Sequence, residues 1–131
     1  MQNEFFLGDA ARMARENENF RHVIFTTTHA QLVLMSIPPG GEIGDEVHPG
    51  VDQLFVFVAG AGEAIVGREE HSVLPGAVVV VPAGTRLNFV TLGAKPLKLF
   101  TIYSPPQHAP GTIHRTKAEA DAAEHDEHHL H

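Results

Sequence analysis

The chain between Val23 and Tyr103 alternates short runs of β-branched and aromatic residues with turns that contain Gly or Pro. Runs of this length, spaced this closely by turn residues, are typical of an all-β barrel or sandwich. Pro presets φ and Gly accepts positive φ, so Pro-Gly pairs between the runs indicate turns. The pattern predicts strands at 23–27, 31–37, 43–48, 52–59, 63–67, 77–81, 85–91 and 97–103.

Two of these runs, 54–59 and 78–81, are apolar on both faces. A strand with one face in water alternates apolar and polar residues, and these two do not. We therefore expect both to lie in the interior or beneath a subunit interface.

The segments on either side of this region are expected to be helical. Asp9 is a suitable N-cap for a short helix at 9–19 that packs outside the strands. A Pro-rich segment follows Tyr103, and then Thr116 and Glu119 form a capping box that opens an acidic helix through about Glu124. With 131 residues the chain is expected to form one domain, 1–131, with a barrel core at about 22–104 and a tail and helix at 105–131.

Composition limits the partners. The formal net charge is −7 and the nine Lys and Arg residues are scattered, so no basic surface is available for nucleic acid. No run approaches the roughly 20 apolar residues that span a bilayer, and the acidic N-terminus lacks the features of a secretory signal. A soluble cytoplasmic protein without nucleic-acid or membrane partners is expected.

The absence of cysteine confines any metal site to imidazole and oxygen donors. There are ten histidines, but four of them, at 125, 128, 129 and 131, lie in the last seven residues and are expected to form a solvated tail. His108 and His114 flank the Pro-rich segment, and the sequence assigns them no role.

Three polar residues are expected to converge. Glu46 and His48 are two residues apart, so in a strand both side chains leave the same face. Pro49 and Gly50 then turn the chain and return Gln53 beside them. A carboxylate, an imidazole and an amide oxygen in this arrangement can bind a divalent ion. The spacing is equally consistent with an exposed Glu46, a hydrogen-bonded His48 and a Gln53 that only begins a strand.

The stretch GGEIGDEVHPGVDQLFVFVAG resembles the first sequence motif of the cupins, with Gly40, Glu46-Val47-His48, Gln53 and Gly60 in the expected places. The stretch GAVVVVPAGTRLN resembles the second motif through Gly76, Pro82 and Gly84. The resemblance implies a double-stranded β-helix, the jelly-roll barrel of the cupins, with short N- and C-terminal helices. It is closest in character to small single-domain bacterial cupins, some of them called mannose-6-phosphate-isomerase-like.

The departures from these motifs concern the metal ligands. Glu46 stands where the family has its first His, Gln53 where it has Glu, and Leu87 where the second motif has His. The resemblance thus implies a reduced site for Ni, Mn, Zn or Fe on Glu46, His48 and Gln53, with weakened affinity because Leu87 offers no lone pair. Alternation directs Leu87 toward the pocket, and Arg86 and Asn88 away from it.

Two functions remain open. In the first, a metal-dependent enzyme acts on a small hydroxylated or carbonyl substrate, in an isomerase-like reaction on a sugar for example, with Glu46 and His48 as catalytic residues. In the second, a cupin without metal or catalysis binds a small molecule in an apolar pocket. That pocket would be lined by Phe55, Phe57, Leu87, Phe89 and Tyr103. With either function, the apolar strands, the Pro-rich tail and the N-terminal Phe5 and Phe6 suggest a homodimer.

Overall fold

The computed structural model describes the chain from residue 5 to residue 130, and its side chains from residue 5 to residue 124. Ten strands and two helices follow one another along it. The elements are α1 (Ala10–Glu16), β1 (Arg21–Thr26), β2 (Gln31–Ile37), β3 (Glu46–Val47), β4 (Asp52–Ala59), β5 (Ala61–Val66), β6 (Glu69–Val73), β7 (Val78–Val81), β8 (Arg86–Leu92), β9 (Leu97–Ser104), β10 (Ile113–His114) and α2 (Lys117–Leu130).

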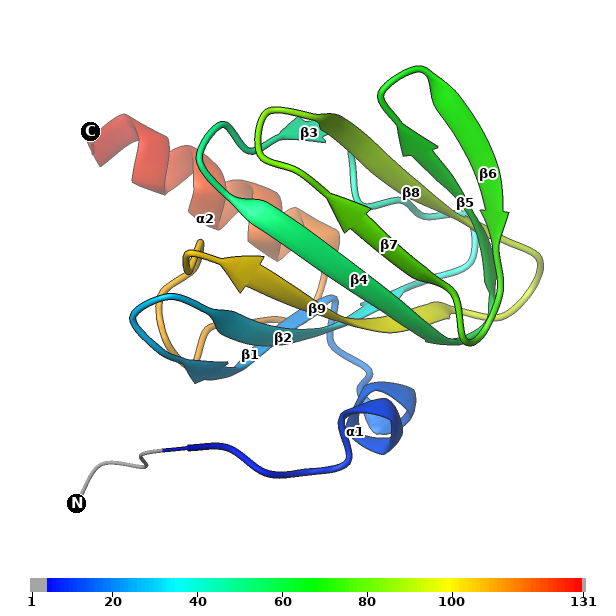
Figure 1. Ribbon diagram of the computed structural model, residues 1–131, viewed down its shortest axis with the longest axis horizontal. Helices are drawn as coiled ribbons and strands as arrows, with labels where there is room; N and C mark the ends of the chain where they lie inside the picture. Colours follow the sequence, from blue (N-terminus) through cyan, green and yellow to red (C-terminus); the bar gives the residue numbers. More distant parts are fainter. Residues whose placement is uncertain (1–4, 131) are drawn as a thin grey trace.

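The strands form two antiparallel sheets that face each other (Figure 1). One sheet has six strands in the order β10-β1-β2-β9-β4-β7, and the other has four in the order β3-β8-β5-β6. Several neighbours in the larger sheet are far apart in sequence: β2 pairs with β9, and β9 pairs with β4. This arrangement is the all-β double-stranded β-helix that the motifs predict.

The space between the sheets is filled by aromatic and aliphatic side chains. The rings of Phe55 and Phe57 on β4 meet Phe89 on β8, with centroids 4.5 and 5.1 Å from it. Leu97 and Leu99 on β9 are fully buried beside them. Inward and outward residues alternate along β9, so the strand shows the period of two expected for a sheet with one face on the core.

The first helix begins where the sequence predicts and ends earlier. The Asp9 side chain accepts a hydrogen bond from the Arg12 backbone N–H, which makes Asp9 the N-cap. The helix was expected to run through 9–19, but Asn17 has extended backbone angles and its side chain bonds to Asn19. An Asn that satisfies backbone groups locally competes with the next helical turn, and the helix stops at Glu16.

Some strands also differ from the expectation. The strand expected at 43–48 is reduced to Glu46–Val47, because Gly44 has φ +107° and interrupts the extended chain after an isolated bridge at Glu42. Two strands were not expected, the polar edge strand β6 and the two-residue β10 that pairs with β1. Only one face of the run 78–81 lies in the interior: Val81 is 2% exposed, whereas Val78 and Val80 are 56% and 61% exposed, on the edge strand of the larger sheet. A place beneath a subunit interface stays a prediction for that exposed face.

The second helix lies across one end of the two sheets (Figure 1). The Glu119 backbone N–H donates to the Thr116 hydroxyl, and the Glu119 carboxylate accepts from the Arg115 backbone N–H. The capping residues predicted from the sequence therefore do open this helix. The side chains of the histidine-rich tail lie outside the described residues.

In the described part of the chain, neither helix combines the length and the apolar character that a membrane span requires.

Candidate functional site

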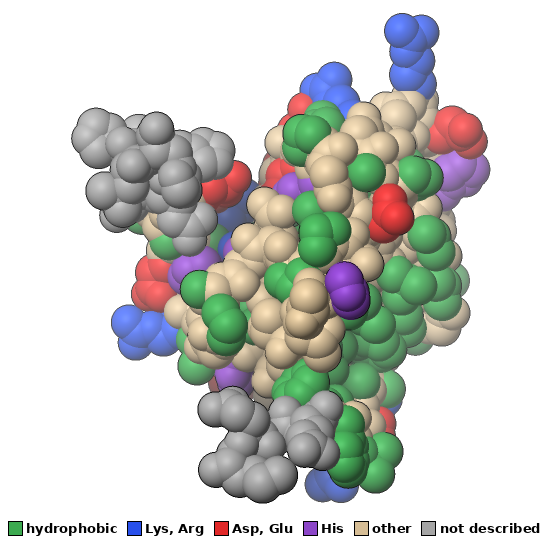
Figure 2. All heavy atoms as spheres, turned by 60° about the vertical axis from the view of Figure 1, so that its left-hand side comes forward, with side chains coloured by type: hydrophobic (Ala, Val, Ile, Leu, Met, Phe, Trp, Pro, Cys, Tyr) green, Lys and Arg blue, Asp and Glu red, His purple; other side chains and the backbone are tan. Residues whose placement is uncertain are grey.

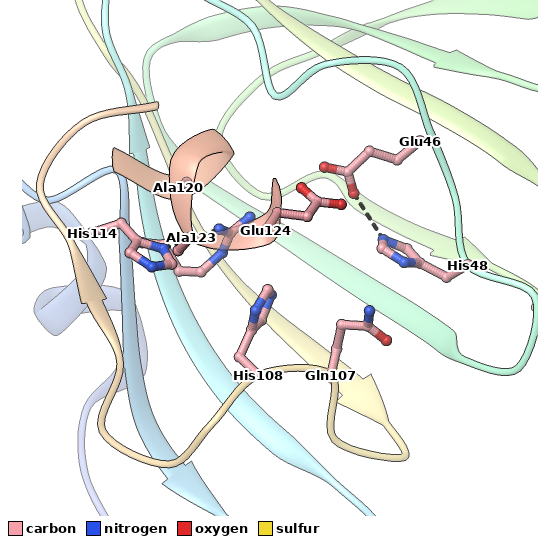
Figure 3. Close-up of a pocket in the computed structure, with 9 residues that line it drawn as sticks. Glu46, His48, Gln107, His108, His114, Ala120, Ala123 and Glu124 are labelled. Carbon is pink, nitrogen blue, oxygen red and sulfur yellow. Dashed lines mark hydrogen bonds and ion pairs between the residues drawn. The ribbon is translucent and has the colours of Figure 1, made fainter. Parts of the chain in front are cut away.

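A small cavity lies at the end of the barrel that α2 covers (Figure 3). The space open to water-sized molecules is about 40 Å³, enough for a few waters or a very small ligand. Its walls come from three parts of the chain: the start of β1, the segment around β3, and the residues that follow β9. The lining residues are Arg21, Glu46, His48, Gln107, His108, His114, Ala120, Ala123 and Glu124.

Glu46 and His48 stand together on one wall of this cavity. Their Oε2 and Nε2 atoms are 2.8 Å apart, and both side chains are largely buried. The two atoms are not aligned as a hydrogen bond, so the buried Nε2 has no hydrogen-bond partner among the described residues. The pair Glu69 and His71 has the same spacing in sequence but lies exposed, and it does form a hydrogen bond, of 3.0 Å.

Gln53 is not among the residues that line the cavity. It is 3% exposed, and its Nε2 donates to the Thr101 hydroxyl at 3.1 Å. Its Oε1 is buried without a partner in the described structure. In the sheet Gln53 is in register with Tyr103, and its side chain interacts with the Tyr103 hydroxyl. The structure therefore brings Glu46 and His48 into contact and sets Gln53 next to Tyr103.

Tyr103 connects these groups to the C-terminal segment. Its ring meets His48 edge-on, with centroids 6.1 Å apart, and meets His108 at 5.2 Å. The hydroxyl lies 3.4 Å from His108 Nε2. Burial raises the pKa of Tyr103 to about 12, against the opposing effect of the nearby Arg21. The phenol is therefore neutral at physiological pH and available as a hydrogen-bond donor.

His108 is held in place by Gln31, a fully buried residue of β2. The Gln31 Oε1 accepts from the backbone N–H groups of Gln107 and His108, and its Nε2 donates to the His108 carbonyl and the Thr26 hydroxyl. Burial, followed by the charges of Arg21, His114 and His48, lowers the pKa of His108 to about 3. The His108 imidazole is thus neutral above about pH 4.

Arg21 supplies a buried positive charge. The residue is 6% exposed, and its Nη1 lies 3.3 Å from His114 Nδ1. Its guanidinium also lies over the Phe20 ring, 5.4 Å from the centroid. The Nε atom is buried without a hydrogen-bond partner among the described residues. None of the ion pairs between described side chains includes Arg21.

The residues expected to line an apolar pocket lie in the packed core instead. Phe55, Phe57 and Phe89 fill the space between the sheets with their rings in contact, and Leu87 is 2% exposed beside them. None of these four borders the cavity beneath α2, and neither does Tyr103, the fifth residue expected in that pocket, which is 2% exposed. The alternation of the strand residues correctly predicts that these side chains face the interior. There they pack closely against one another as part of the hydrophobic core. Asn88 points away from the cavity as expected, bonding to the Gly44 backbone and to Glu42.

The reduced ligand set fits a divalent ion in its chemistry. Two ligands about 2.1 Å from one ion and at right angles to each other are about 3 Å apart, and the Glu46 and His48 atoms are 2.8 Å apart without being hydrogen-bonded. The unpartnered Gln53 Oε1 is the third donor, on a residue in register with Tyr103, whose ring contacts His48. Among the described side chains, no three His, Cys, Asp or Glu residues gather as a metal site, so any such ion depends on the amide.

Sequence reasoning missed most of the opposite wall. Arg21 and His114 come together because β10 pairs with β1, and the two residues are 93 positions apart in the chain. Ala120 and Glu124 reach the cavity only because α2 lies over the barrel end. No local pattern carries this information. The one available signal was the presence of His108 and His114 around the Pro-rich segment.

Comparison with known proteins places this geometry in a family. The cupin domain family matches residues 33–103. The Bacillus subtilis protein YrkC is 41% identical over 125 residues, which cover 91% of this chain and 67% of YrkC. The protein L612 of Acanthamoeba polyphaga mimivirus is 37% identical over 116 residues, covering 86% of this chain and 72% of L612.

Among solved structures, the crystal structure of BH2720 from Bacillus halodurans superimposes with a TM-score of 0.88 at 38% identity, over 89% of this chain and 93% of that one. The likeness therefore extends beyond the barrel strands to most of the chain.

Proposed function

The chain belongs to the cupin family, and we propose that it binds a divalent metal ion through Glu46, His48 and Gln53 and a small hydroxylated or carbonyl molecule in the adjoining cavity. We further propose that it carries out an isomerase-like proton transfer on that molecule. The observation that carries this proposal is the 2.8 Å approach of the Glu46 and His48 donor atoms without a hydrogen bond between them.

The donor types favour a borderline or hard ion. One imidazole with two oxygen donors suits Mn, Ni, Zn or Fe and leaves coordination positions for water or substrate. The absence of a donor at Leu87, which packs directly opposite Glu46 in the sheet, means that the ion would be held with fewer protein ligands than usual in the family. We therefore expect modest affinity.

A bound ion would act as a Lewis acid that polarises a substrate oxygen. The chain itself contributes proton chemistry and positioning. The neutral Tyr103 hydroxyl can donate a hydrogen bond, and Glu46 can accept a proton as general base when its free oxygen faces the substrate. Helix α2 contributes the small side chains Ala120 and Ala123 to the cavity wall, which leaves room for a small molecule beside these groups.

Metal binding can be measured on protein without a polyhistidine tag, with the four histidines at 125, 128, 129 and 131 changed to Gln so that they do not contribute. We expect about one equivalent of Mn or Ni by titration calorimetry, and at least tenfold weaker binding in His48→Ala, since one of three ligands is lost. His71→Ala is the matched control, because it removes an imidazole from the exposed Glu-x-His pair. Equal binding by His48→Ala and the parent would refute the proposal.

A second function, ligand binding without metal, is favoured by the packing of Leu87 into the core. In this case His48 and Gln53 would orient the ligand with hydrogen bonds alone. Less than a tenth of an equivalent of metal after purification, with no gain on adding Mn, Ni, Zn or Fe, would leave this second function as the better account.

A further inference from the structure

We propose that the cavity beneath α2 binds a singly charged carboxylate, and that Arg21 is the residue that holds it. This inference extends the proposed function by naming the charge and chemical class of the ligand, which would be a small hydroxy or oxo acid. It starts from Arg21, which lies outside the two cupin motifs and whose side chain faces the same cavity as Glu46 and His48.

The first ground is the state of the guanidinium. Arginine stays protonated in proteins, and a charge taken out of water without a partner is strongly unfavourable. Arg21 is 94% buried, has no carboxylate partner among the described residues, and leaves its Nε donor unused. Contacts with His114 and Phe20 satisfy part of the side chain. Glu46 and Glu124 line the same cavity, but neither forms an ion pair with Arg21. A bound anion would supply the missing acceptor and a negative charge in direct contact.

The second ground is the geometry of the donor. A guanidinium presents its N–H groups in a planar fork that matches the two oxygens of a carboxylate. The Arg21 Nε–H is one arm of such a fork, and the Tyr103 hydroxyl interacts with the same guanidinium. The neutral His108 imidazole stands against that hydroxyl. These neighbours offer hydrogen bonds without further charge.

The third ground concerns the size and charge of the ligand. Only about 40 Å³ is open to water-sized molecules, which limits the bound part to a group of a few atoms. Glu46 and Glu124 also line the cavity, and Figure 3 shows Glu124 of α2 extending toward Glu46. Two carboxylates around one guanidinium disfavour a doubly charged anion, so a monocarboxylate is preferred over phosphate.

The test uses the full chain and the resolved Nε–Hε signal that a buried arginine gives in proton–nitrogen NMR spectra. We expect sodium acetate or formate to shift the Arg21 signal with saturation, while acetamide and sodium chloride at equal concentration leave it unchanged. Arg21→Lys should weaken acetate binding at least tenfold, because the fork is lost. Arg68→Met, which removes an exposed arginine in the β5–β6 turn, should bind acetate like the parent.

Two further variants sharpen the result. Glu124→Gln should tighten acetate binding severalfold, because a competing carboxylate is removed from the cavity. His48→Ala should still bind acetate even when its metal binding is lost, so the anion site and the metal site can fail separately. Metal binding without any acetate shift would overturn this inference and leave the proposed function standing. Phosphate binding as tightly as acetate would overturn the assignment to a monocarboxylate.

Discussion

Lowering the pH should destabilise the fold specifically through His108. Its imidazole is neutral in the folded protein because burial and the surrounding Arg21, His114 and His48 lower the pKa from the ordinary 6.5 to about 3. Between these two values the unfolded chain binds a proton that the folded chain does not. The stability that this group contributes is therefore fully present above pH 6.5, declines as the pH falls, and is lost completely only below about pH 3.

The magnitude at pH 5 follows from the same two values. At that pH the unfolded His108 is almost fully protonated and the folded one almost fully neutral, so the difference spans about 1.5 pH units. At about 1.4 kcal/mol per unit this amounts to about 2 kcal/mol of unfolding free energy lost between pH 8 and pH 5. His108→Gln removes the titrating group and retains a side chain that can hydrogen-bond with the Tyr103 hydroxyl.

Urea denaturation of the parent and of His108→Gln at pH 8 and pH 5 measures this directly, because taking the difference between the two proteins cancels the contributions of the other histidines. We expect the parent to lose about 2 kcal/mol more than the variant over this interval. His29→Gln, a change at an exposed histidine, is the control for the loss of one imidazole and should follow the parent. If His108→Gln and the parent lost the same stability, the buried neutral state of His108 would be wrong.

Two other predictions concern the position of the tail and the assembly. Gln31→Met should lower the unfolding free energy by about 3 kcal/mol in urea denaturation, since it removes three hydrogen bonds to the partly buried backbone of Gln107 and His108, each worth about 1 kcal/mol. A loss below about 1 kcal/mol would show that water replaces these bonds. Hydrophobic side chains gather on one side of the surface (Figure 2). The exposed Val78 and Val80 lie on β7, the edge strand of the larger sheet. Because an edge strand has unpaired backbone groups, we expect two copies of the chain to pair through this edge. Val80→Lys should then convert a dimer to a monomer in light scattering, whereas Val47→Lys, at another exposed valine, should not; a monomeric parent protein would contradict the expectation.

The strands that could be predicted from the sequence are those whose apolar residues indicate that the strand is buried. β2, β4 and β9 carry apolar residues bounded by turn residues, and each appears within one residue of its predicted bounds. The strand β6 has the sequence EEHSV and is exposed along four of its five residues, so no hydrophobic pattern marks it. It is a strand because β5 pairs with it, a contact that the local sequence does not encode.

The spacing of the motif residues predicted other features of the fold. The glycine that ends the first motif, Gly60, has φ +80°, and a Cβ there would stand 2.2 Å from the Pro96 carbonyl oxygen. This position needs Gly for two separate reasons, which explains why a spacing rule can locate it. The same rule predicted that Glu46 and His48 would meet, because a two-residue spacing in extended chain is enough to place both on one face.

The cavity is lined partly by residues that the sequence motifs locate and partly by residues that no local pattern marks. The region of the two motifs, 40–88, contributes Glu46 and His48, whereas Arg21 and every other lining residue come from the segments before and after it. Those segments are joined to each other by the pairing of β1 with β10 and to the barrel by Gln31. Because the flanking segments supply the buried cation and the cover, a change in them would alter which ligand fits while the Glu46–His48 corner stayed intact. We therefore expect ligand preference among close relatives to follow the residues at positions 21, 108 and 124 rather than the barrel motifs.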